Sequence, residues 1–70
     1  MKIWIVYQFM SDPEAYFKKK EDAKRYVEKQ EPDGFWNGND YHLTLEGSRK
    51  KHVMYRKTMP EYMIEQTEVK

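Results

Sequence analysis

The chain has 70 residues, of which 13 are basic and 12 acidic, so its net charge is only +1. This length allows one small domain, 1–70, while the absence of cysteine excludes disulfides and two histidines are too few for a classical zinc site. No stretch approaches the roughly 20 apolar residues that cross a bilayer, so we expect a cytoplasmic protein with no membrane contact, metal or cofactor.

The first predicted element is a strand over residues 2–10. One of its faces carries Ile3, Ile5, Tyr7 and Phe9, and the other carries Trp4, Val6 and Met10. Because both faces are apolar, we expect a central strand covered on two sides. Ser11, Asp12 and Pro13 then favour a turn or the first position of a helix.

The next segment has the spacing of an amphipathic helix that runs to Gln30. Its apolar side is formed by Ala23, Tyr26, Val27 and Gln30, at intervals of three and four residues. The sequence allows two starts for this helix, Asp12 and Lys20. Pro32, Gly34 and Gly38 are expected to end the helix and open a loop.

Two further strands are expected after this loop. Residues 41–46 alternate in polarity, with His42 on the solvent side, and a hairpin turn over 47–51 leads to a second strand, 52–59. Residues 61–69 alternate as in an edge strand, although Thr58 and Glu61 have the spacing of a helix capping box. The alternation favours a short final strand.

These elements predict an α+β fold, with a small antiparallel or mixed sheet of three to four strands and one helix packed on one face. The order is β-α-β-β, with or without the C-terminal strand. A single helix covers one face only, so the apolar side chains of the opposite face need a partner, a dimer mate or the loop. Aromatic residues form 16% of the chain, which fits either a dense core or an interface.

The loop DGFWNGNDYH, 33–42, places Phe35 and Trp36 among turn-forming residues. Either both rings fold back to cap the sheet, or they anchor a partner, or one ring does each. Asp40 and His42 do not form a catalytic constellation with any other group, and a surface role is expected for His42.

A basic segment, SRKKHVMYRK, covers residues 48–57 and interleaves cations with aromatic rings. This arrangement suits a partner of negative charge and leaves nucleic-acid binding open as an alternative. The predicted partner-binding residues are Phe35, Trp36, Tyr41, Arg49, Lys50, Lys51, Tyr55 and Arg56. No residue is predicted to be catalytic.

Residues 17–29 follow the first strand with a Phe, Glu-x-Ala, aromatic and β-branched pattern, formed by Phe17, Glu21, Ala23, Tyr26 and Val27. The pattern resembles one found in small proteins encoded by bacteriophages and other mobile elements, and it covers about the first 30 residues. The resemblance implies a β-α-β-β fold and a phage setting. In that setting short proteins bind and block one host bacterial protein, in host takeover or anti-defence.

We therefore expect a non-enzymatic protein that binds and inhibits or sequesters a host bacterial protein in the host cytoplasm. The first alternative is a small nucleic-acid-binding accessory protein that uses residues 48–57. A further alternative is an obligate homodimer that buries its own second sheet face and serves as a scaffold.

Overall fold

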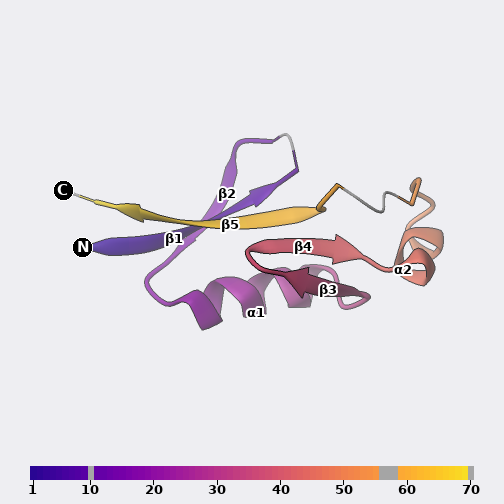
Figure 1. Ribbon diagram of the computed structural model, residues 1–70, viewed down its shortest axis with the longest axis horizontal. Helices are drawn as coiled ribbons and strands as arrows, with labels where there is room; N and C mark the ends of the chain where they lie inside the picture. Colours follow the sequence, from indigo (N-terminus) through magenta and orange to yellow (C-terminus); the bar gives the residue numbers. More distant parts are fainter. Residues whose placement is uncertain (10, 56–58, 70) are drawn as a thin grey trace.

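A computed structural model describes residues 1–9, 11–55 and 59–69. In chain order the elements are β1 (Lys2–Gln8), β2 (Pro13–Phe17), α1 (Lys20–Gln30), β3 (Gly34–Asn37), β4 (Asp40–Leu43), α2 (Leu45–Lys50) and β5 (Tyr62–Glu68). The strands form one sheet in the order β2-β1-β5-β4-β3, and every neighbouring pair is antiparallel. Figure 1 shows α1 running alongside this sheet, with α2 beyond the end of β4.

The α+β class is confirmed, but the predicted count of elements was too low. The described residues contain five strands and two helices, in place of three to four strands and one helix. The two missed strands are β2 and β3, and the missed helix is α2. Each of them lies where turn-forming residues dominate the sequence.

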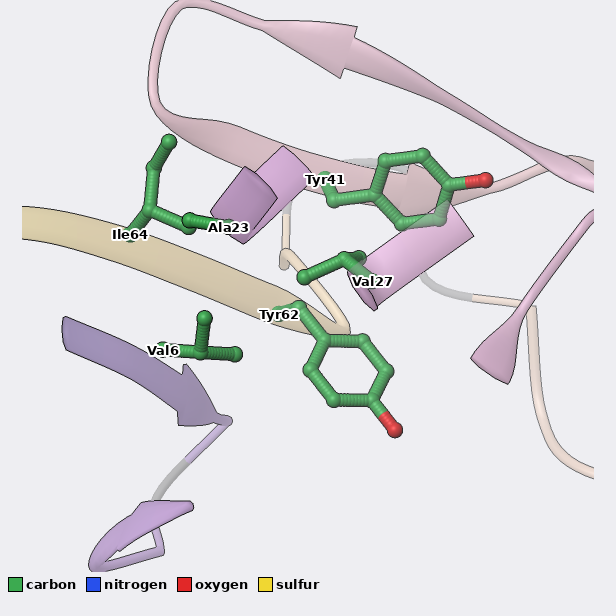
Figure 2. Close-up of a cluster of buried hydrophobic side chains, with 6 residues drawn as sticks. All are labelled: Val6, Ala23, Val27, Tyr41, Tyr62 and Ile64. Atoms are coloured by element: carbon green, nitrogen blue, oxygen red, sulfur yellow. The ribbon is translucent and has the colours of Figure 1, made fainter. Parts of the chain in front are cut away.

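The core lies between the sheet and α1. Val6 of β1 pairs with Ile64 of β5, and Tyr41 of β4 pairs with Tyr62 of β5, which places all four on the same face. Ala23 and Val27 of α1 pack against this face, and Figure 2 shows the six side chains together. We call this the front face of the sheet and the opposite one the back face.

Helix α1 begins at Lys20, the later of the two starts left open by the sequence. Lys19 is extended at its N-terminus, and Glu21 and Asp22 in the first turn complement the helix dipole. Only Ala23 and Val27 are buried, which confirms that the helix packs on one side. Tyr26 adds a tilted contact with Phe17 of β2, with the ring centroids 5.5 Å apart.

Residues 13–17 form the edge strand β2, and the predicted turn or helix start at Pro13 was wrong. Proline is tolerated at the first position of an edge strand because its missing N–H group is not needed there. Ala15 and Phe17 face the core, and Tyr16 between them points to the back face. The expected turn is confined to the residues before Pro13, where the N–H of Ser11 donates to Gln8 O.

The predicted loop over 33–42 is largely a β-hairpin. Strands β3 and β4 are joined by Gly38 and Asn39, and Gly38 has a φ of 65°, as the first central residue of a type II′ turn requires. Gly34 is also constrained, because a Cβ there would lie 2.5 Å from a carbon of the Tyr41 ring. A Gly-Asn dipeptide between two strands is a recognised hairpin signal that the sequence interpretation did not use.

The predicted hairpin turn over 47–51 is instead the second half of α2 and its C-terminus. Thr44 caps this helix, since its Oγ1 accepts from the N–H of Gly47 at 3.0 Å and donates to Asp33 O at 3.1 Å. The predicted strand 41–46 therefore ends at Leu43. Residues 53–55 have no regular structure, and the rest of the predicted strand 52–59 falls partly outside the described residues, as does Met10.

The final strand is confirmed as β5, but its predicted position at the sheet edge was wrong. It lies at the centre of the sheet and pairs with β1 over its whole length, from Lys2 opposite Glu68 to Gln8 opposite Tyr62. Its ladder with β4 is short, with only Asp40 opposite Met63 and Tyr41 opposite Tyr62. Neither helix of the described residues is long and apolar enough to cross a membrane.

Candidate functional site

The back face of the sheet carries a second group of apolar side chains, outside the core cluster. Strand register arranges them in rows that run across the sheet. The rows are Ile3–Thr67, then Tyr16–Ile5–Glu65, then Tyr7–Met63–Asp40–Asn37, and finally His42–Phe35. Ile5 and Met63 thus lie near the middle of this face, with aromatic rings toward both outer strands.

No helix packs over this part of the back face. None of the back-face residues of β1, β2 and β5 is buried, and Tyr16 is 60% exposed. Phe35 on the opposite edge strand is 50% exposed. The expectation that one helix leaves a second apolar face uncovered is confirmed for the described residues, so β1 is covered on one side and not on two.

Tyr7 and Glu65 lie diagonally on the back face, because Tyr7 is opposite Met63 and Ile5 is opposite Glu65. Partial burial, followed by the nearby Glu65 carboxylate, raises the pKa of the Tyr7 hydroxyl above its usual value. The Tyr16 hydroxyl adds a smaller effect in the same direction. Aromatic and acidic groups therefore share one patch on this face.

Phe35 of the edge strand β3 stacks on His42 of β4, on the same face. Their ring centroids are 5.6 Å apart and the rings are inclined by 20°. His42 is only 7% exposed, so its predicted position in solvent was wrong. Its Nδ1 atom has no hydrogen-bond partner among the residues that the structure describes. The histidine thus forms a support beneath an exposed phenylalanine ring.

Trp36 lies on the front face and is held there by three contacts. Its ring packs on that of Tyr41 with centroids 4.9 Å apart, and its Nε1–H donates to Glu28 Oε2 at 2.8 Å. The Lys24 ammonium lies 5.0 Å from the ring centroid, in cation–π distance. Of the three alternatives for the two rings, the structure has the one in which they differ. Trp36 covers the core, and Phe35 projects from the opposite face.

Tyr41 belongs to the core, although the sequence suggested that it contacts a partner. It is 1% exposed, and its hydroxyl donates to the backbone carbonyl of Glu31 at the end of α1. Burial, followed by the nearby carboxylates of Glu28 and Glu31, raises the pKa of Tyr41. A partner that approaches the folded chain does not reach this side chain.

The basic residues predicted to bind a partner lie around α2 and are partly neutralised by acids of the chain. Lys50 Nζ is 3.5 Å from Asp33 Oδ2, while Lys51 pairs with Glu31 and lies 3.9 Å from Glu61 Oε1. Of the remaining predicted residues, Arg49 is exposed on α2, Tyr55 is 41% exposed in an irregular segment, and Arg56 lies outside the described residues. Where the sequence predicted a basic hairpin, the described residues form α2 and an irregular segment over 53–55.

A cavity of about 330 Å³ lies at the end of the sheet where β1 and β4 finish. Its lining includes Phe9, Leu43 and residues that precede β5. Val53, Met54 and Met59 contribute apolar walls, and Glu61, already near Lys51, contributes the acidic group. Within the described residues, no three acidic or histidine side chains come together as a metal site.

The residues that sequence reasoning missed are Tyr16, Met63, Asp40 and Glu65 of the back face. Alternation along 13–17 and 62–68 was the available signal, because it assigns every second residue to one face. The chain matches none of the family models, characterised proteins or solved structures with which it was compared.

Proposed function

We propose that this chain is a non-enzymatic protein that binds another protein through the back face of its sheet, and that binding inhibits or sequesters the partner. The observation that carries this proposal is the uncovered apolar surface formed by Ile3, Ile5, Tyr7, Tyr16, Phe35 and Met63. Apolar side chains that gather on an uncovered face are typical of interaction sites. The proposed partner is a host bacterial protein, as the phage-like sequence pattern implies.

The composition of the face supports this proposal. Tyrosine, phenylalanine and methionine are enriched at the centres of protein interfaces, and all three occur on the strands of this face. Side chains fixed on a sheet lose little conformational freedom when a partner binds. Tyr16 and Phe35, at 60% and 50% exposure, are the two rings best placed to act as anchors.

Nucleic-acid binding by residues 48–57 has less support than the sequence suggested. The Lys50 and Lys51 ammonium groups face Asp33, Glu31 and Glu61, so part of their charge is directed to the chain itself. A phosphate backbone would have to compete with these carboxylates. No observation on the described residues favours this alternative over protein binding.

The test is affinity purification from a bacterial lysate with the wild-type chain, the Tyr16→Ser/Phe35→Ser variant and the Lys29→Ala variant, a change on the exposed side of α1. We expect one stoichiometric protein with the wild type and the Lys29→Ala control, and its loss with the double variant. All three substitutions are at exposed side chains, so circular dichroism should show an unchanged fold. Retention of the partner by the double variant would show that the back face is not the binding site.

A further inference from the structure

The charges on the back face allow a statement about what covers it. Its acidic members are Asp40 and Glu65, which flank Met63 because Asp40 is opposite Met63 and Glu65 is two residues further along β5. The strand positions that face this side contain no lysine or arginine. Neither carboxylate has an ion pair among the described residues. The face is thus apolar with uncompensated negative charge near its middle.

We propose that the back face binds a protein surface on which arginine or lysine side chains stand among apolar ones; this inference rests on the proposed function. A basic side chain set over Met63 reaches both carboxylates, and the neighbouring rings of Tyr7 and Tyr16 offer cation–π contact. Arginine fits best, because its planar guanidinium group donates to carboxylates in pairs and stacks on aromatic rings. The apolar remainder of the partner covers Ile3, Ile5 and Phe35.

The same charges argue against a second copy of this chain as the occupant. A symmetric dimer brings the same patch together from both subunits. Asp40 and Glu65 of one copy would then meet an apolar face that supplies the same acids and no cation. Burial of carboxylates without a partner charge opposes association. A basic partner removes this penalty, and a second copy increases it.

The experiment selects peptides from a displayed library of random sequences with the immobilised full chain. We expect the recovered peptides to be enriched in arginine or lysine beside apolar residues, and to lose binding with the Tyr16→Ser/Phe35→Ser variant. The Asp40→Asn/Glu65→Gln variant should bind them about tenfold more weakly, since two exposed ion pairs of about threefold each are removed. Raising the salt from about 0.05 M to about 0.5 M should weaken the wild type and leave this variant nearly unchanged.

The control variant is Glu21→Gln/Glu46→Gln, which removes two exposed carboxylates from the helices and leaves the back face intact. It should bind the recovered peptides as the wild type does. If peptides depend on Tyr16 and Phe35 but are not basic, the inference on charge fails while the proposed function stands. If no recovered peptide depends on these rings, both fail. If sedimentation gives a dimer that Phe35→Ser dissociates, a second copy is the occupant and the inference is overturned.

Discussion

Phe35 and Trp36 are consecutive in β3, yet their rings lie on opposite faces of the sheet. Trp36 packs on Tyr41 and is tied to Glu28 of α1, whereas Phe35 stacks on His42 and is half exposed. The two-residue alternation of a strand produces this separation. We therefore expect the stability of the fold to depend on Trp36 and the proposed partner binding to depend on Phe35.

Replacement of Trp36 by alanine is expected to destabilise the fold by about 2 kcal/mol, because the ring is partly buried and its loss exposes Tyr41. The melting temperature should fall by about 10 °C in a domain of this size. Urea unfolding followed by circular dichroism measures the change. Phe35→Ala is the matched control and should shift the free energy of unfolding by less than about 1 kcal/mol; equal losses in the two variants would contradict the assignment of faces.

Phe35→Ala and Tyr16→Ala should each weaken partner binding by about 2 kcal/mol, as expected for aromatic rings that anchor an interface. Calorimetric titration with the purified partner measures this loss. Lys29→Ala, an exposed change on α1, serves as the control. Unchanged affinity in both aromatic variants would place the interface elsewhere.

Gly34→Ala is expected to destabilise the chain by about 2 kcal/mol. The added methyl group would lie 2.5 Å from the Tyr41 ring and 2.6 Å from the backbone oxygen of His42, so the hairpin must shift. Gly38→Asn should cost less, because nothing lies within 4 Å of a Cβ there and the strain of a positive φ is its only penalty. Chemical denaturation of both variants tests the contrast, which is absent if the two glycines are interchangeable turn residues.

Thr44→Ala removes the N-terminal cap of α2 and the bond to Asp33, and should cost about 1 to 2 kcal/mol. Thr44→Ser keeps the hydroxyl and should retain most of the stability. Thermal melts of the two variants provide the measurement. A serine variant as unstable as the alanine variant would show that the methyl group, and not the cap, matters.

The stability of the fold should fall as pH rises from about 10 to 12. Burial, followed by nearby carboxylates of which Glu14 acts most strongly, raises the pKa of Tyr62 from its ordinary 10.0 to about 12. The unfolded chain then loses the phenol proton near pH 10, while the folded chain keeps it until about pH 12, so rising pH favours unfolding over this interval. Urea unfolding at a series of pH values should show a smaller decline in Tyr62→Phe than in Tyr26→Phe, and equal declines would contradict the assignment.

The sequence was sufficient to predict the elements whose apolar residues recur with a long, regular period. β1, α1 and β5 combine apolar residues at strand or helix spacing, and β1 already showed the second apolar row that became the back face. β2 was not predicted because Pro13 favours a turn, although an edge strand accepts proline at its first position. α2 escaped because Gly47 and Ser48 suggest a hairpin, while in the structure both are buried.

The candidate site was predicted only in part for a related reason. The sequence identified Phe35 and Trp36 as residues of interest, but the face of each ring follows from the β3–β4 register, which a loop assignment does not provide. The basic residues of 48–57 were assigned to a hairpin, whereas those that the structure describes lie on α2 and at its C-terminus. Their neighbours Glu31 and Asp33 are about 20 residues away in the chain, so only tertiary folding brings them together.

The short β4–β5 ladder has a consequence for the mechanics of the sheet. Few backbone hydrogen bonds cross this seam, among them Ile64 N to Asn39 O and Glu61 N to Tyr41 O, whereas β1 and β5 are joined along seven residues each. The sheet therefore has two parts: β2, β1 and β5 are firmly joined, and the β3–β4 hairpin is joined to them by few hydrogen bonds. Trp36 and Tyr41 of the hairpin are hydrogen-bonded to α1 and its C-terminal end. Tyr16 lies on β2 and Phe35 on β3, in different parts of the sheet. The distance between the two rings is therefore the dimension of the back face that changes at the lowest cost in energy when a partner surface of different curvature binds.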